Sequence, residues 1–370
     1  MLQSHARRLG ALIVGVVLAL PLAALAQTKA PETAPAKQAQ AAKPAEAAAP
    51  TAQPASPPPK PAAGSTAVPG WNNPPESWDA LSEKPQYASI PGVEKNRLIQ
   101  GEGREWRALR NGPITRYAGW LIAGVFAAIV LFYLIRGTIP THGAPTGRLI
   151  ERFNAVERVT HWTMTIAFVL LALSGVVILW GKHIVLPWLG YTGNSWLTIF
   201  AKNLHNFIGP LFIFSLAVLF LLFVKDNFFA KGDGYWLSKV GGMLGGEEPP
   251  SGRFNAGEKI WFWLATIVFG IAISVTGLIL DFPNWNQARE VMQYANVIHA
   301  VIAVLFICGA LGHGYLGTLG VDGAWKAMRD GYVDETWAKS HHSLWYDEVK
   351  AGKRSERVIP AGAQPAAGDD

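Results

Sequence analysis

The sequence contains little charge and almost no cysteine. Only 16% of its 370 residues are Asp, Glu, Lys or Arg, against about 25% in average soluble domains. The single cysteine, Cys308, excludes an internal disulfide, a Cys-x-x-Cys-His haem attachment site and a cysteine-ligated iron–sulfur cluster. Any cofactor must therefore be held by other side chains. Half of the residues are hydrophobic and 15 are Trp, which is the composition of a membrane protein.

The N-terminal third predicts an exported region. Residues 1–26 have a basic start, an apolar run and a small-residue cleavage site, which is typical of a secretory signal peptide. An uncleaved anchor helix is the alternative. Residues 27–69 are low-complexity Ala, Pro, Gln and Lys, so we expect a disordered linker. Residues 70–116 are more varied and are expected to form an extracytoplasmic segment.

Five long apolar runs predict membrane-spanning helices. Each is near the roughly 20 residues needed to cross a bilayer, and a helix satisfies its own backbone inside lipid. We expect an all-α integral membrane protein with one extra N-terminal transmembrane helix, a four-helix domain over 150–348 and a cytoplasmic tail over 349–370. The runs cover roughly 117–135, 161–181, 207–224, 260–281 and 297–318.

The distribution of positive charge predicts the orientation. The formal charge of +6 comes from Lys and Arg that gather in the loops after the first and third runs and in the tail, whereas the other two loops hold only Lys182, Lys202 and Arg289. Cytoplasmic loops are the positive ones. We therefore expect a multi-pass protein of the bacterial inner membrane with a periplasmic N-terminal segment and a cytoplasmic C-terminus. Its partner is membrane lipid, not nucleic acid.

Four histidines lie within or beside these apolar runs, where a titratable side chain usually marks a function. His205 and His299 are expected near the outer membrane face, and His161 and His313 near the inner face. His299 and His313 are 14 residues apart, so on a helix they face one side and lie about 21 Å apart. We therefore expect two pairs, His205 with His299 and His161 with His313.

Two opposed imidazoles from separate helices suit the axial positions of a b-type haem, because no carboxylate or thiolate accompanies them to complete a zinc site. Small residues beside the histidines would allow a flat ring to approach the backbone. The alternative is that the histidines only form hydrogen bonds across the bundle. The remaining histidines of the loops and tail are expected on a solvated surface: His142, His183, His341 and His342.

Five segments between about residues 150 and 348 then form an ordered series: RFNAVERVTHWTMTIAFVLLALSGV, KNLHNFIGPLFIF, RFNAGEKIWFWLATIVFGIAISVTGLIL, VIHAVIAVLFICGALGHGYLG and AWKAMRDGYVDETWAKSHHSLWY. This series resembles the gamma subunit of membrane-bound formate dehydrogenase, a four-helix di-haem cytochrome b. The extra helix over 117–135 and the signal-bearing region depart from the shortest members of that family and resemble longer ones.

The resemblance implies two haems b, with His205 and His299 on the outer one and His161 and His313 on the inner one. It also implies a quinone site formed by Asn255, Gly257 and Glu258. Seen on its own, that stretch predicts only a helix start with Asn255 as N-cap.

The implied function is electron transfer in anaerobic respiration. An iron–sulfur beta subunit, joined to a molybdenum- or tungsten-containing alpha subunit, would deliver electrons that pass across the membrane to the quinone pool. The chain itself carries no ligand set for formate oxidation, so it would be a subunit of an oxidoreductase rather than a catalyst alone. A cytochrome b anchor of a hydrogenase or thiosulfate-type reductase is the alternative. A transporter or assembly factor using the histidines for proton relay is a further one.

Overall fold

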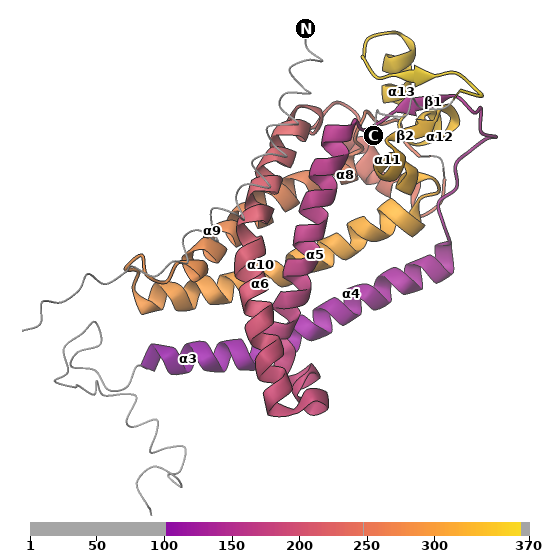
Figure 1. The fold of residues 1–370 in the computed structure, drawn as a ribbon. Helices are drawn as coiled ribbons and strands as arrows, with labels where there is room; N and C mark the ends of the chain where they lie inside the picture. The colour runs from indigo at the N-terminus through magenta and orange to yellow at the C-terminus, as the bar shows by residue number, and fades with distance from the viewer. Residues whose placement is uncertain (1–100, 247, 364–370) are drawn as a thin grey trace, which may run out of the picture. The chain divides into compact units, whose positions relative to one another are not determined.

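The computed structural model describes residues 101–246 and 248–363 (Figure 1). The predicted signal peptide and linker lie outside these residues. The elements are α3 (Gly101–Leu109), η1 (Arg110–Ile114), α4 (Thr115–Arg136), β1 (Leu149–Glu151), α5 (Ala155–Ile184), α6 (Leu186–Phe223), η2 (Val224–Asp226), α7 (Asp233–Ser238), η3 (Val240–Gly242), α8 (Ala256–Trp263), η4 (Leu264–Phe269), α9 (Gly270–Asp281), α10 (Arg289–Tyr315), η5 (Leu316–Gly320), α11 (Ala324–Asp330), β2 (Tyr332–Asp334), α12 (Glu335–His341), α13 (Ser343–Lys350) and β3 (Val358–Ile359).

Within the described residues, five helices are long and apolar enough to cross a membrane, which confirms the five predicted spans. Each extends beyond its apolar run at one end or at both, because polar residues continue the helix there. Their outward surfaces are apolar, as lipid contact requires. The spans are Gly103–Arg136, Ala155–Ile184, Leu186–Asp226, Ala256–Asp281 and Arg289–Gly320.

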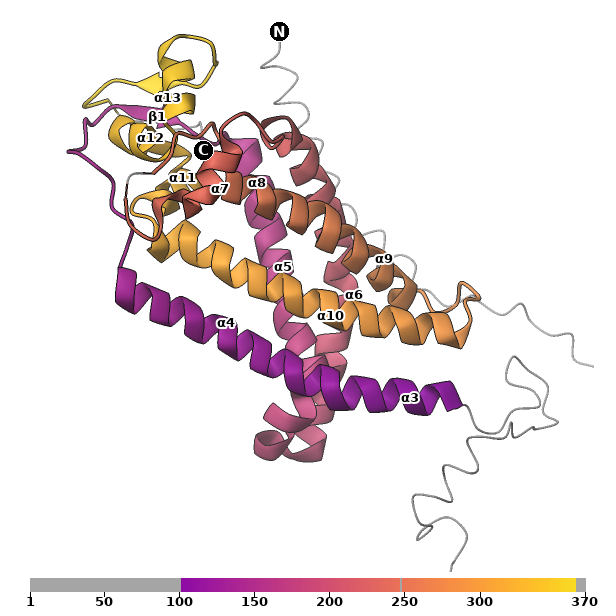
Figure 2. The same cartoon turned by 180° about the vertical axis from the view of Figure 1, so that it is seen from behind.

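The helices pack as neighbours around α10. α5 runs beside α6, and α10 contacts α9 on one flank and α4 on the other (Figures 1 and 2). α3, η1 and α4 form one continuous helix, which we call the leading helix. It begins well before residue 117, where the apolar run starts, because the polar segment 101–116 is helical too. We call the turn between α5 and α6 the hairpin end of the bundle.

The opposite end carries a small folded unit that the sequence did not predict. β1 pairs antiparallel with β2 on one edge and with β3 on the other, giving the order β2-β1-β3. α11, α12 and α13 pack against this sheet, and we call the whole unit the cap. The segment 349–359 is not a free tail, because β3 returns to pair with β1. These strands are only two or three residues long and pair with segments far away in the sequence, so no local pattern predicts them.

The expectation that His341 and His342 lie on a solvated surface is wrong, because they are only 4% and 2% exposed. The Nδ1 of His342 lies 2.8 Å from the carbonyl oxygen of Gly252, and the Nδ1 of His341 lies 2.6 Å from a carboxylate oxygen of Glu248. The cap thus closes over the loop that precedes α8, and these histidines fasten the two together.

Two of the membrane helices begin with the same sequence, Arg-Phe-Asn-Ala, and the same capping box. At α5 the side chain of Asn154 accepts from the backbone N–H of Glu157, and the Glu157 carboxylate accepts from that of Asn154, both at 3.0 Å. Asn255 and Glu258 repeat this at α8, at 2.9 and 2.8 Å. The reciprocal bonds satisfy N–H groups that a helix start leaves free. The predicted N-cap at Asn255 is confirmed.

Candidate functional site

Four histidines in the bundle form two facing pairs. The ring centroids of His205 and His299 lie 6.0 Å apart, and those of His161 and His313 lie 6.1 Å apart. α10 contributes one ring to each pair, while α6 supplies His205 and α5 supplies His161. We call them the hairpin-side pair and the cap-side pair. The 14-residue spacing on α10 separates the two levels by about 21 Å.

Hydroxyl groups fix the rings of the hairpin-side pair. Ser174 Oγ lies 2.9 Å from His205 Nδ1 and donates its own proton to the carbonyl of Leu170 at 2.7 Å. Because a hydroxyl has one proton, the imidazole must be the donor in the first contact. Thr276 Oγ1 holds His299 Nδ1 in the same way, at 3.0 Å, and donates to the carbonyl of Ala272. Both rings of this pair therefore carry a proton on Nδ1 and leave Nε2 with a free lone pair.

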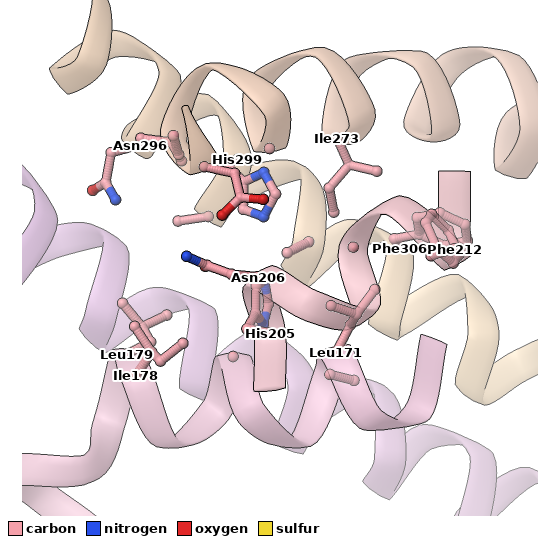
Figure 3. Close-up of a pocket in the computed structure, with 18 of the residues that line it drawn as sticks. Leu171, Ile178, Leu179, His205, Asn206, Phe212, Ile273, Asn296, His299 and Phe306 are labelled. Carbon is pink, nitrogen blue, oxygen red and sulfur yellow. The ribbon is translucent and has the colours of Figure 1, made fainter. Parts of the chain in front are cut away.

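A cavity of about 290 Å³ lies against this pair and is lined by both rings. Most of its wall is apolar, and Figure 3 shows where two of its amide side chains lie. Asn206 and Asn296 lie on one side of the two histidines, whereas Phe212 and Phe306 lie on the other. The cavity thus has a polar side and an aromatic side. Arg110, Lys202 and Asp281 also line it.

The cap-side pair is held by packing. The ring of Trp261 is stacked on that of His313, with centroids 5.5 Å apart and an angle of 21° between planes. A Cβ at Gly309 would lie 2.3 Å from this indole, so only glycine admits the tryptophan here. The Nδ1 of His161 is buried and has no hydrogen-bond partner among the described residues.

The pairs fit the axial positions of a six-coordinate metal. With metal–nitrogen distances of about 2.0 Å, two imidazoles on opposite sides of one ion have centroids about 6 Å apart, which is the separation in both pairs. No third His, Cys, Asp or Glu of the described residues joins them to make a metal site. The remaining coordination positions are those a porphyrin fills, and imidazole suits haem iron.

The residues that the resemblance assigns to quinone lie together at the start of α8, at the cap end. Glu258 accepts from Arg152 at 3.2 Å and keeps a partly exposed side chain. Gly257 lies under Trp236, whose ring a Cβ there would meet at 3.0 Å. The indole N–H of Trp236 is buried and unpartnered within the described part of the chain. This leaves a donor and a carboxylate beside the same helix start.

Two buried arginines brace this region. Arg152 is 2% exposed and is surrounded by the rings of four aromatic residues. Burial lowers its pKa to about 10, although Glu258 opposes the shift. Arg253 bonds to Glu157 at 2.8 Å and to Asp226 at 2.7 Å. Burial lowers the pKa of Arg253, but these carboxylates outweigh it, so the net shift is upward.

The hydroxyl partners of the histidines were not predicted, although the sequence holds a signal for them. Ser174-Gly175 follows Asn154 by 20 residues, and Thr276-Gly277 follows Asn255 by 21. The extra residue sits in the π turn η4, which adds one residue to the helix. In each case the glycine faces the neighbouring histidine ring, which a Cβ would meet at 3.6 and 3.3 Å. The repeated capping box and the repeated hydroxyl–glycine pair mark the two helices as internal counterparts.

Comparisons with known proteins identify related sequences. A sequence model of the family described as prokaryotic cytochrome b561 matches residues 152–331, which include all four histidines. The chain is 34% identical over 221 residues to the nitrate-inducible formate dehydrogenase cytochrome b556(Fdn) subunit of Escherichia coli K12. The match covers 57% of this chain and 98% of that protein.

Two further relatives carry related names. The formate dehydrogenase cytochrome b556(fdo) subunit of Escherichia coli K12 is 33% identical over 205 residues, covering 54% of this chain and 93% of the relative. The formate dehydrogenase cytochrome b556 subunit of Haemophilus influenzae is 28% identical over 225 residues, covering 57% and 87%. The chain therefore belongs to the formate dehydrogenase cytochrome b subunit family.

Proposed function

We propose that this chain is the membrane-bound electron-transfer subunit of a formate dehydrogenase complex and that it holds two b-type haems. The observation that carries the proposal is that two pairs of histidines face each other on helices long enough to cross a membrane. The ring centroids are 6.0 Å apart in one pair and 6.1 Å apart in the other. Electrons would pass from a partner's iron–sulfur cluster at the hairpin end to quinone at the cap end.

His205 and His299 would ligate one haem iron, and His161 and His313 the other. When bound, the haems supply one-electron carriers at two depths of the membrane. The protein's part is to orient the ligands. Ser174 and Thr276 hold Nδ1 of the hairpin-side rings, so that Nε2 faces the space between them. Trp261 holds His313 by stacking.

Quinone would bind beside α8, where Asn255, Gly257 and Glu258 lie. Quinone reduction consumes protons, and a partly exposed carboxylate can hold one at the site. The Oε1 of Glu258 lies 3.2 Å from Arg152, whose fixed charge would position this carboxylate. The indole N–H of Trp236 is a candidate donor to the substrate.

The proposal places the cap in the cytoplasm and the hairpin end toward the periplasm. The excess of Lys and Arg in the loops of the cap end supports this orientation in the bacterial inner membrane. The partners would be an iron–sulfur beta subunit and a molybdenum- or tungsten-containing alpha subunit on the periplasmic side. The alpha subunit would oxidise formate, and this chain would provide the membrane part of the complex.

The test is to purify the tagged chain with its partners from native membranes and to follow the b-haem absorption bands. Formate should reduce these bands, and a water-soluble quinone analogue should reoxidise them. Glu258→Ala should slow the reoxidation and leave reduction by formate unchanged. Bands reduced by hydrogen or by a thiosulfate-type donor, but not by formate, would assign the chain to the anchor of another oxidoreductase. A preparation without haem would reject the electron-transfer role.

A further inference from the structure

The leading helix is joined to the wall of the hairpin-side cavity. The indole N–H of Trp106 on α3 donates to Asn296 Oδ1 on α10 at 3.2 Å, and Asn296 lines the cavity. On the other flank, the indole N–H of Trp180 on α5 donates to the carbonyl of Thr115 at 2.8 Å. These bonds fix the helix on both sides of the segment Arg110–Ile114.

That segment is a π turn. A π turn carries one more residue than an α turn, so it changes the angle at which the preceding residues point, and such turns are frequent at functional sites. Pro113 removes one backbone donor within it. The carbonyl of Arg110 accepts from both the backbone N–H and the Oγ1 of Thr115, the latter at 2.6 Å. The turn therefore changes the direction in which the side chains of α3 point relative to those of α4.

Arg110 stands at this turn, one turn after Trp106, and lines the cavity together with Asn296. It is half-buried, and its guanidinium donates to the amide oxygen of neighbouring Asn111 at 3.0 Å. No carboxylate of the described residues forms an ion pair with it. Lys202 lines the same cavity and donates to Asn206 at 2.6 Å. Asp281 is the single carboxylate of the cavity lining, so the lining carries one net positive charge.

We infer that the leading helix is part of the haem pocket and that Arg110 binds a propionate carboxylate of the hairpin-side haem. The inference rests on the proposed function, because it requires a haem between His205 and His299. A b-type haem presents two carboxylates at one edge of an otherwise apolar ring. The cavity presents two amides on one side of the histidines and aromatic rings on the other (Figure 3), and the cations Arg110 and Lys202 line the same cavity.

Arginine is the side chain best suited to this contact. Its planar guanidinium meets a carboxylate with two parallel hydrogen bonds, and a lysine cannot do so. A basic residue near a membrane face is ordinarily exposed to water and binds no cofactor. Arg107, one turn earlier on the same helix, is exposed in this way. It is therefore the matched control for Arg110.

The experiment compares Arg110→Gln with Arg107→Gln in the complex purified from membranes. Haem content and the midpoint potentials of both haems are measured by spectroscopic redox titration. A cation near a propionate favours the reduced haem, so its loss should lower one of the two potentials. We expect a tenfold shift in the reduced-to-oxidised ratio at fixed applied potential, which is 59 mV for a one-electron couple. Loss of that one haem from Arg110→Gln alone would also support the inference.

Arg110→Lys keeps the charge and should shift the potential less than Arg110→Gln. Equal shifts in these two variants would assign the effect to packing and overturn the inference. So would potentials in Arg110→Gln that match those of Arg107→Gln with both haems present. Should Arg110→Gln not accumulate, Arg110→Lys decides, and potentials matching those of Arg107→Lys would overturn the inference. Haem missing from the wild type would instead reject the proposed function.

Discussion

Thr276 Oγ1 lies 3.0 Å from His299 Nδ1 and donates its own proton to the carbonyl of Ala272 at 2.7 Å. The threonine oxygen is thus an acceptor toward the ring and fixes its tautomer. Ser174 does the same for His205. Partners of this kind orient metal-binding histidines and raise their basicity. The two hydroxyls would therefore orient the rings of the hairpin-side pair as haem ligands, although neither faces the space between the rings.

Removing these acceptors should raise one haem potential. Ser174→Ala or Thr276→Val makes the attached imidazole a weaker donor to iron, which disfavours the oxidised haem. We expect both haems to remain and one midpoint potential to rise by tens of millivolts, where 59 mV corresponds to a tenfold change for one electron. Redox titration measures this.

Ser215→Ala is the matched control for the serine variant. Its hydroxyl is buried and bonds to the carbonyl of Phe212 at 3.0 Å, as a helical serine does, and no contact with a histidine is made by that oxygen. Potentials that move equally in Ser174→Ala and Ser215→Ala would contradict the assigned role.

Gly309→Ala should disturb the cap-side pair alone. The added Cβ would lie 2.3 Å from the ring of Trp261, so the indole must leave its stack on His313. Overpacking of this kind costs about 1–3 kcal/mol. We expect the optical signal of one haem to weaken or shift. Gly124→Ala on α4, where nothing lies within 4 Å, should leave both haems unchanged. An unaltered spectrum in Gly309→Ala would refute the stacking role.

Arg253→Gln should destabilise the protein through the carboxylates it leaves behind. Asp226 keeps a bond to Arg354 at 3.0 Å, but the buried Glu157 loses its arginine. Breaking a buried pair on one side costs about 3–5 kcal/mol, which thermal unfolding in detergent would show as a lower midpoint. The double variant Arg253→Gln/Glu157→Gln should recover part of the loss. A double variant that equals the sum of the singles would mean that the two side chains are not coupled.

Acid should loosen the cap through His342. Burial, and then the charge of Arg152, hold the pKa of His342 well below 6.5 in the folded protein. The unfolded chain takes up this proton near pH 6.5. Between those values the unfolded state carries more protons, so stability falls as the pH is lowered, by at most about 1.4 kcal/mol per pH unit.

Tryptophan fluorescence during thermal unfolding at pH 7.5 and 5.5 measures this effect. The cap should unfold at a lower temperature at pH 5.5. His342→Asn, which cannot take up that proton, should show a smaller difference between the two pH values. The same difference in both proteins would exclude His342 as the cause.

Much of the membrane domain could be predicted, because each feature is encoded locally. Apolar runs near 20 residues long indicated five helices, and the 14 residues between His299 and His313 placed both on one side of α10. The polar start of the leading helix was not predicted, since the sequence indicated only an extracytoplasmic segment over 70–116. Its helical state depends on contacts with Asn296 and Trp180, which are distant in sequence.

The cap and the second partners of the histidines were not predicted for a related reason. The burial of His341 follows from the closure of α12 over the loop before α8, and no spacing in the tail reveals that contact. Ser174 and Thr276 look like ordinary helical residues, since small polar side chains are common in membrane helices. Only the comparison of α5 with α8 and α9 shows that each follows its capping box at nearly the same distance.

The central claim is that two histidine pairs each hold one haem. Pyridine-haem quantitation with a reduced-minus-oxidised spectrum tests it most directly, on the wild type beside His299→Ala and His313→Ala. The account predicts two b-type haems per chain in the wild type and one in each variant, with a different haem lost in each. No haem in a folded, membrane-inserted wild type, or two haems retained in either variant, would contradict it.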